Sequence, residues 1–380
     1  MRVVFLLSNS RIVGGGDYFI YKIAEYLARR GNDITIFVTT KKASYLKNIP
    51  NLKNLTIYSS GIIPKMFKGA GFLNRLWTKA YTKIIIEPFL RDGEDIDFLI
   101  GYHRDDTIRV SELGKKYGKP SGTFVFETPQ WMHSQLKDRW LKEYKGKFKK
   151  SWILTKEALK KIDIIFPISN LTREENQKWI NRKIEAPIYP GLDKDVVDKV
   201  HVKKENQIIY VGRLSAYKNV DLLLEVVSKL DNPPKLVICG DGEERTNLIN
   251  LAKKLNINCE FKHDIPGRSK WEEIKRSLFM IFPTSFEGFG MPPMEALYCG
   301  IPCVCSDIPI LREIYKDKVE YFKESSSNDL RNKILLLLKN PSYCKKRGKE
   351  GRNYIQSMYS WEKSAENVEK ILTRYRNERH

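Results

Sequence analysis

The stretch Met280-Ile-Phe-Pro-Thr-Ser-Phe-Glu-Gly-Phe-Gly-Met-Pro-Pro-Met-Glu-Ala-Leu297 predicts a buried strand, a glycine-containing turn and the start of a helix. Glu287 follows the strand, and Glu295 lies one turn into the helix. The first N–H groups of a helix lack intrahelical partners and suit anions, whereas carboxylates repel phosphate and accept hydrogen bonds from hydroxyl groups. The pattern therefore predicts a ligand with both phosphates and hydroxyl groups, and a nucleotide sugar has both.

Short apolar segments alternate with amphipathic helical patterns through both halves of the chain. This alternation predicts an α/β fold of doubly wound parallel sheets, because parallel strands are connected by helical crossovers. The predicted strands are 3–7, 34–38, 98–101, 124–126 and 164–168 in a first sheet, and 208–211, 236–239, 259–262, 280–283 and 303–305 in a second.

The chain has 380 residues, which is long for one core and sufficient for two domains. We expect the boundary at Tyr189-Pro-Gly-Leu-Asp193, which precedes a polar stretch. Residues 1–192 would form the first domain and residues 193–360 the second. The final segment, 361–380, is predicted as an amphipathic helix that packs back on the first domain.

Composition and charge limit the classes of partner. The chain is 42% hydrophobic and 30% charged, as in soluble globular proteins, and no apolar run is long enough to span a membrane. Residues 1–190 hold 34 Lys and Arg against 19 Asp and Glu, and this excess predicts an anionic partner. Segments 62–91 and 131–152 mix lysines with aromatic residues, which favours an anionic membrane surface. The alternative is ordinary amphipathic helices on the core; nucleic acid is not expected, because no nucleic-acid-binding module is visible.

All six cysteines lie in the second half, without a Cys-x-x-Cys pair or a histidine at zinc-finger spacing. Such cysteines are typical of buried thiols in a reducing cytoplasm, and a metal site is not expected. We therefore expect a cytoplasmic protein, peripheral at the inner face of the cell membrane.

Two loops of the second domain carry candidate phosphate ligands. Gly212, Arg213 and Lys218 follow the strand 208–211, and in doubly wound sheets ligands bind beyond the strand carboxyl ends. Two cations there would neutralise a diphosphate and stabilise it as it leaves; the alternative is a pair of solvated surface charges. Asp241, in the turn Cys239-Gly-Asp-Gly-Glu-Glu244, would line the same cleft or belong to a plain tight turn.

The first domain offers a second set of candidates. Gly15 and Gly16 open the first long helix and would allow a ligand to approach the backbone closely, unless they belong to an ordinary flexible loop. His103, Glu127 and His133 follow predicted strands and would orient an acceptor hydroxyl or act as a base. A structural role is the alternative for each of them.

Together these residues resemble the retaining glycosyltransferases of family 4, over nearly the whole chain and most closely from Ile208 to Ile314. Glu287-Gly-Phe-Gly-Met-Pro-Pro-Met-Glu295 is similar to the family's Glu-x7-Glu motif. The resemblance implies the GT-B fold, in which two Rossmann-like domains face each other, and a metal-independent reaction without a cofactor. Many relatives carry a histidine where this chain has Glu127. The implied donor contacts are Arg213 and Lys218 on the diphosphate, Glu295 on the ribose, Glu287 on the transferred sugar, the N–H groups of Phe289, Gly290 and Met291 near sugar and phosphate, Ile265 near the base, and Gly15 and Gly16 on the diphosphate.

The expected activity is transfer of a hexose, glucose or mannose, from a nucleotide sugar to a lipid-linked or polysaccharide-precursor acceptor. A 2-epimerase that acts on the donor alone is the enzymatic alternative, and incubation with donor alone separates the two. A binding scaffold on an inactive transferase fold is the non-enzymatic alternative. The complete set of Arg213, Lys218, Glu287 and Glu295 argues against that scaffold.

Overall fold

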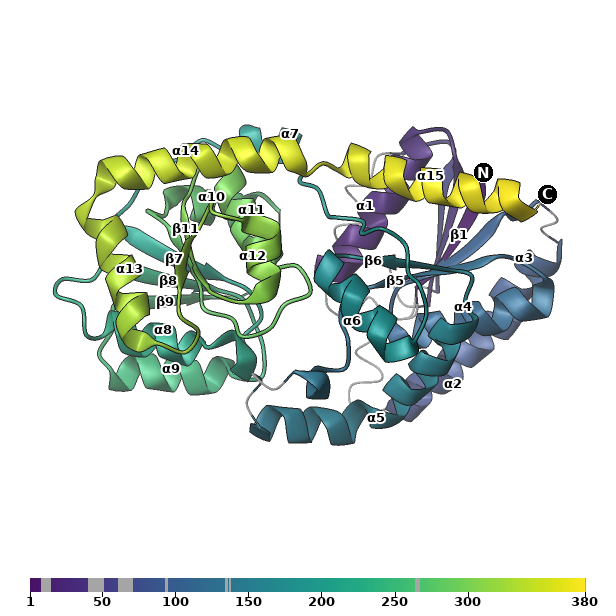
Figure 1. The fold of residues 1–380 in the computed structure, drawn as a ribbon, viewed down its shortest axis with the longest axis horizontal. Coiled ribbons are helices and arrows are strands. Elements are labelled where there is room, and N and C mark those ends of the chain that lie inside the picture. Colours follow the sequence, from purple (N-terminus) through teal and green to yellow (C-terminus); the bar gives the residue numbers. More distant parts are fainter. Residues whose placement is uncertain are drawn as a thin grey trace. The chain divides into compact units, whose positions relative to one another are not determined.

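The computed structural model describes residues 1–7, 15–39, 51–60, 71–92, 95–133, 136, 138–263 and 267–379 (Figure 1). The chain divides into two compact units. The first contains Met1–Thr128, Lys147–Gly191 and Trp361–His380, and the second contains Pro129–Gly146 and Leu192–Ser360. The sequence analysis had placed all of residues 1–192 in the first domain, whereas Pro129–Gly146 makes its contacts with the second unit.

The first unit contains a six-stranded parallel sheet with the order β3-β2-β1-β4-β5-β6. Its central strands are almost completely buried, which is why they stand out as apolar runs. The sequence analysis did not predict β3, whose residues are half-buried or exposed at the sheet edge. The strands are β1 (Arg2–Leu7), β2 (Asp33–Val38), β3 (Leu55–Ser59), β4 (Phe98–Gly101), β5 (Ser121–Val125) and β6 (Ile164–Pro167).

Helices cover both faces of this sheet. Helix α1 (Gly15–Arg29) packs on one face, where Phe19 contacts Phe124 of β5 with ring centroids 5.4 Å apart. The other face packs against a cluster that includes Tyr81, Leu90, Val110, Leu159 and Ile180. These residues come from the helical segments on that face, which are α2 (Gly71–Tyr81), the π-helix η3 (Thr82–Ile86), α3 (Glu87–Asp92), α4 (Arg104–Tyr117), α5 (Asp138–Lys161) and α6 (Asn170–Ile180); a 3-10 turn, η4 (Gln130–Met132), precedes α5.

The C-terminal helix α15 (Trp361–Arg379) belongs to the first unit and lies beside α1 (Figure 1). Trp361 is completely buried, with its ring 6.0 Å from Tyr18 and 5.7 Å from Phe19, centroid to centroid. At the other end of α1, Glu369 accepts hydrogen bonds from Arg30 and Asn32, each at 2.6 Å. The prediction that the last helix returns to the first domain is therefore confirmed.

The second unit contains another six-stranded parallel sheet, with the order β12-β11-β10-β7-β8-β9. The five predicted strands are present, and the sequence analysis did not predict β12, a strand of three residues at the edge. The strands are β7 (Gln207–Val211), β8 (Lys235–Cys239), β9 (Cys259–Lys262), β10 (Met280–Phe282), β11 (Cys303–Ser306) and β12 (Glu320–Phe322).

Helices α8, α9 and α13 lie on one face of the second sheet, and α10, α11 and α14 lie on the other (Figure 1). The helical segments of this unit are α7 (Lys194–Asp198), η5 (Ala216–Lys218), α8 (Val220–Val227), α9 (Arg245–Lys254), α10 (Arg268–Arg276), α11 (Met291–Tyr298), α12 (Pro309–Tyr315), α13 (Ser327–Lys339) and α14 (Pro341–Met358). None of the described helices is long and apolar enough to cross a bilayer.

Both sheets have the same topology. Numbered within its own unit, each sheet has the order 3-2-1-4-5-6, which is that of doubly wound nucleotide-binding domains. The strand order reverses between β1 and β4 in the first unit and between β7 and β10 in the second. The predicted fold class of two Rossmann-like domains is thus confirmed, and each unit has a switch point at which ligands are expected.

We expect Trp361→Ala to destabilise the first unit by about 3–5 kcal/mol, because a large buried ring is lost between α15 and α1. Urea unfolding followed by circular dichroism measures the change. Glu362→Ala, at an exposed neighbouring position of the same helix, is the control and should leave the midpoint unchanged. Equal midpoints for both variants would contradict the proposed anchoring of α15.

Candidate functional site

The loops after β7 and β8 extend the sheet beyond its strands. The N–H of Gly212 donates to the carbonyl of Cys239 at 3.0 Å, and the N–H of Leu214 donates to the carbonyl of Asp241 at 2.9 Å. Glycine is required at position 240, because a Cβ there would overlap the carbonyl oxygen of Gly212. The two predicted donor loops are therefore held against each other by their backbones.

A hydrogen bond holds the backbone of Arg213, whereas its side chain is exposed. Its carbonyl accepts a hydrogen bond from the buried hydroxyl of Tyr210 at 2.9 Å. The side chain is exposed, and no described residue bonds its guanidinium. Arg213 lies close enough to Lys218 that its charge opposes protonation of the lysine. The structure thus places both predicted cations at the carboxyl end of β7.

Lys218, at the end of η5, forms an ion pair with Oε1 of Glu287. Both side chains are nearly buried, with exposed fractions of 10% and 13%. Burial opposes the charged ammonium, but the adjacent Glu287 carboxylate outweighs it, so the pKa of Lys218 is raised. The ammonium also lies 4.9 Å from the ring centroid of Tyr217 and 5.6 Å from that of Phe282, at cation–π distance. Lys218 is therefore a charged group with a fixed position.

Hydrogen bonds hold the two loops that carry this pair. The side-chain amide of Asn219 donates to the carbonyl of Pro283 at 3.0 Å and to the hydroxyl of Ser285 at 2.7 Å. The N–H of Ser285 donates to the carbonyl of Tyr217 at 2.9 Å. The loops after β7 and β10 thus meet at the switch point of the second sheet.

The N-terminus of α11 offers few backbone donors. Gly290 caps the helix with a φ of +85°, and a Cβ there would lie 2.8 Å from Leu311. Tyr315 donates its hydroxyl hydrogen to the carbonyl of Gly290, and the same hydroxyl accepts the N–H of Met294 at 3.0 Å. The residues between Met291 and Met294 are prolines and have no N–H. In the described chain, the N–H groups of Gly290 and Met291 have no acceptor, and their role near sugar and phosphate stays a prediction.

Glu295 points from α11 toward α10. Its Oε1 accepts a hydrogen bond from Nζ of Lys270 at 2.7 Å, and its side chain is only 8% exposed. Lys270 lies over the ring of Trp271, 4.5 Å from the centroid. The sequence analysis did not identify Lys270, because the amphipathic pattern of α10 gives no sign that this lysine contacts a glutamate 25 residues away.

Two further donor-side predictions are Asp241 and Ile265. Asp241 is exposed and lies 3.2 Å from Nε2 of His263, which follows β9. The two side chains are thus in ion-pair distance on neighbouring turns. Ile265, predicted near the base, lies outside the described residues.

In the first unit, the start of α1 meets the ends of β4 and β5. Gly15 is the first residue of α1, and a Cβ added to Gly16 would contact the rings of Tyr102 at 3.6 Å and Phe126 at 3.8 Å. The hydroxyl of Tyr102 donates to Oδ1 of Asp17, and burial is the first reason that the pKa of Tyr102 is strongly raised. Tyr102 and Asp17 are not among the site residues that the sequence analysis predicted. A tyrosine directly after a strand does not by itself indicate a functional site.

The structure brings two of the three acceptor-side candidates to this end of the first sheet. His103 is the exposed N-cap of α4, and its ring lies 6.2 Å from that of Tyr102. Glu127 is half-buried and follows β5 by two residues. Its neighbour Thr128 donates to Oε2 of Glu175 at 2.9 Å, and burial raises the pKa of this Glu175 carboxyl despite that bond.

The third candidate, His133, lies elsewhere. It belongs to Pro129–Gly146, which packs with the second unit, and its ring is 4.6 Å from that of Phe286, centroid to centroid. Burial lowers the pKa of His133, which favours the neutral imidazole. The structure therefore groups His133 with the second unit, whereas the sequence analysis had placed it with the first-domain residues. Phe286, which the His133 ring contacts, directly precedes Glu287 in the sequence.

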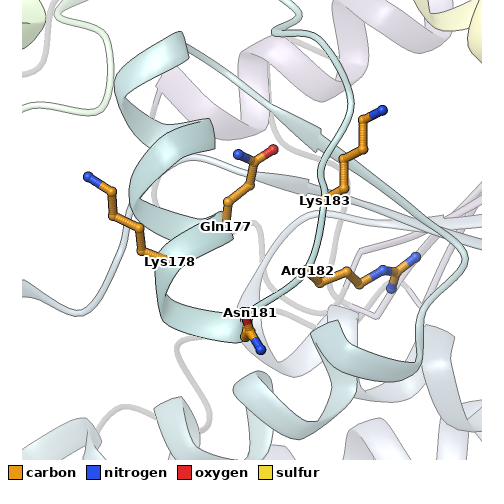
Figure 2. A pocket seen from close by; sticks show the side chains of 5 residues that line it. All are labelled: Gln177, Lys178, Asn181, Arg182 and Lys183. Atoms are coloured by element: carbon orange, nitrogen blue, oxygen red, sulfur yellow. The ribbon is translucent and has the colours of Figure 1, made fainter.

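Two surface hollows lie apart from these residues. One, of about 390 Å³, is lined by Gln177, Lys178, Asn181, Arg182 and Lys183 at the end of α6, and these side chains point in different directions (Figure 2). Its arginine is committed to backbone carbonyls. The other, of about 100 Å³, lies between the start of α8 and α9. Its lining includes none of the four charged residues Arg213, Lys218, Glu287 and Glu295.

The second unit matches a known family. Residues 193–354 match the family model described as glycosyl transferases group 1. An uncharacterized glycosyltransferase of Methanocaldococcus jannaschii is 29% identical over 52% of this chain and 55% of its own length. The N-acetylgalactosamine-N,N'-diacetylbacillosaminyl-diphospho-undecaprenol 4-alpha-N-acetylgalactosaminyltransferase of Campylobacter jejuni is 31% identical over 39% of this chain and 42% of its own length. The chain thus spans about half the length of these relatives.

The whole fold resembles that of a solved protein. HepE of Anabaena, determined in complex with UDP-glucose, superimposes with a TM-score of 0.76 over 98% of this chain and 99% of its own, at 12% identity. This likeness shows the fold. The expected resemblance to glycosyltransferases is confirmed at the level of group 1, and the narrower assignment to family 4 through the Glu-x7-Glu motif stays a prediction.

The Lys218–Glu287 pair makes a testable contribution to stability. We expect Lys218→Met and Glu287→Gln each to destabilise the second unit by roughly 3 kcal/mol, because each leaves a nearly buried charge without its partner. The double variant should lose less than the sum, by about 1 kcal/mol or more. Urea denaturation of the four proteins gives this cycle, and strictly additive losses would show that the two charges do not interact.

Proposed function

We propose that this protein is a retaining glycosyltransferase that moves a hexose, glucose or mannose, from a nucleotide diphosphate sugar to a lipid-linked or polysaccharide-precursor acceptor. The observation that carries the proposal is the Lys218–Glu287 pair at the switch point of a unit that matches glycosyl transferases group 1. The name of the Campylobacter relative, which includes a diphospho-undecaprenol acceptor, supports the lipid-linked class.

The charges suit departure of a diphosphate. When the bond between the anomeric carbon and the phosphate oxygen breaks, the electron pair stays on the nucleoside diphosphate and its negative charge grows. Arg213, with an open guanidinium, and Lys218, held as a cation, would stabilise that charge without a divalent metal. Once Lys218 faces the diphosphate, Glu287 is available to a sugar hydroxyl. The acceptor oxygen forms the new bond on the same face, and its proton passes to the leaving phosphate.

The first unit would bind the acceptor. Gly16, Tyr102, His103 and Glu127 gather around the carboxyl ends of adjacent strands, at the switch point of that sheet. An exposed imidazole and a half-buried carboxylate suit hydroxyl groups of a glycan. We assign Tyr102, His103 and Glu127 to acceptor recognition and the loops of the second unit to the donor.

The outer surface of the first unit supports a peripheral position at the inner face of the cell membrane. On α5, Lys149 and Lys150 are exposed and are followed one turn later by Ile153 and Leu154, whose exposed fractions are 54% and 47%. Basic and apolar residues on one helical face suit the boundary between anionic headgroups and acyl chains.

The segment from α2 to η3 has the same character. Leu76, Lys79, Lys83 and Ile84 are all exposed, and Ile84 has an exposed fraction of 68%. Their spacing follows one side of a helix, and the underlying Tyr81 and Ile86 pack into the core. The other part of the predicted basic segment, residues 62–70, lies outside the described residues.

We expect Glu287→Gln to lower sugar transfer by about 100-fold or more, since a group that faces the reacting sugar would lose its charge. Radiolabelled nucleotide sugars incubated with a membrane-lipid extract measure transfer to acceptor. Glu225→Gln, an exposed glutamate of α8, is the matched control and should retain activity. Wild-type turnover by the Glu287 variant would refute the assignment. Conversion of the donor without any acceptor would favour the epimerase instead.

Membrane binding has a separate prediction. The wild-type protein should sediment with phosphatidylglycerol-containing vesicles at low salt and less so as salt rises, because screening weakens its attraction to the anionic surface. The double variant Lys149→Glu/Lys150→Glu should lose most of this binding. Lys363→Glu/Lys370→Glu, which makes the same charge change on α15 across the sheet, should keep it. Equal binding to pure phosphatidylcholine vesicles would contradict the electrostatic account.

A further inference from the structure

Lys270 is held in a defined position in the first turn of α10. The helix begins after Gly267, which has a φ of +63°, and Lys270 is its third residue. Its ammonium lies 4.5 Å from the centroid of the Trp271 ring, and Trp271 is itself 5% exposed. A lysine side chain normally samples many rotamers, but this one lies on a fixed aromatic platform and ends in a salt bridge. Its ammonium therefore has little freedom.

The salt bridge leaves half of the Glu295 carboxylate available. Nζ of Lys270 bonds Oε1 at 2.7 Å, while Oε2 accepts no hydrogen bond from any described residue. Each carboxylate oxygen has two acceptor positions, so Oε2 has both and Oε1 retains one. Glu295 can thus accept hydrogen bonds from a pair of neighbouring hydroxyl groups without releasing Lys270.

The two glutamates of the site have different relations to their lysines. Lys218 lies at the end of β7 with Arg213, so an entering diphosphate would compete with Glu287 for its ammonium. Lys270 instead belongs to α10, and it is bonded to a carboxylate that is buried. A buried carboxylate without a counter-charge is costly and tends to turn toward solvent, whereas the bond to Lys270 holds this one in place.

We propose that Lys270 is a positioning residue that holds the Glu295 carboxylate oriented for the vicinal hydroxyl groups of the nucleotide ribose, and so sets the preference for a ribonucleotide donor. The proposal rests on the proposed function, because it assumes that the second unit binds a nucleotide sugar. It concerns a residue that contacts the ligand only through Glu295.

The test compares ligands with and without those hydroxyl groups. Isothermal titration calorimetry with UDP, GDP, ADP and CDP identifies the nucleoside diphosphate that the wild-type protein binds best, and its 2′,3′-dideoxy form is the second probe. Lys270→Met keeps the aliphatic stem on Trp271 but removes the charge. We expect it to weaken the ribonucleotide by about tenfold, as for a charged hydrogen bond, and to change the dideoxy form by less than about twofold.

Two further variants make the result specific. Lys270→Arg retains a cation for Glu295 and should restore most of the ribonucleotide affinity. Arg268→Met removes an equal charge from the same turn of α10, where Arg268 pairs with Glu272, and should leave both affinities unchanged. A parallel loss for the two ligands in Lys270→Met would overturn the proposal, since it would indicate a general structural role or a direct phosphate contact. Failure of all four nucleotides to bind the wild-type protein would instead reject the proposed function, and this inference with it.

Discussion

The candidate site depends on the place where β7 and β10 lie side by side and their following segments diverge to opposite faces of the sheet. The loops after the two strands meet there, and they carry a lysine and a glutamate that neutralise each other. A nearly buried charge without a partner is costly, so each of the two residues requires the other. The same requirement keeps Lys218 charged and Glu287 within reach of it, and this suits a ligand that combines an anion with hydroxyl groups.

Burial decides which strands the sequence reveals. The strands near the centre of each sheet have both faces covered and appear as continuous apolar runs, for example Phe5 and Leu6 in β1, which are fully buried. The edge strands β3 and β12 lack such runs: Tyr58 in β3 is 44% exposed, and β12 has only three residues. The two-unit α/β architecture was therefore predictable, whereas the edges depend on contacts that a local pattern does not record.

The same distinction holds for the site. Arg213, Lys218 and Glu287 were predictable because each follows a buried strand, and loops at the carboxyl ends of parallel strands meet at one edge. The contact of Lys270 with Glu295 arises from the packing of two helices. The position of His133 beside Phe286 arises because its segment, Pro129–Gly146, belongs to the second unit. No spacing along the chain encodes either, because both follow from tertiary packing.

The N-terminus of α11 has fewer free backbone N–H groups than a typical helix start. A helix start normally offers several free N–H groups to an anion. Here Pro292 and Pro293 have none, and Tyr315 accepts the N–H of Met294. Among the described residues of this helix start, Met291 and the capping Gly290 therefore keep the open donors. A helix of eight residues with so few donors is a weak anion site by itself. In the proposed function, the charge of a diphosphate would therefore be balanced chiefly by Arg213 and Lys218, and the start of α11 would mainly help to orient the ligand.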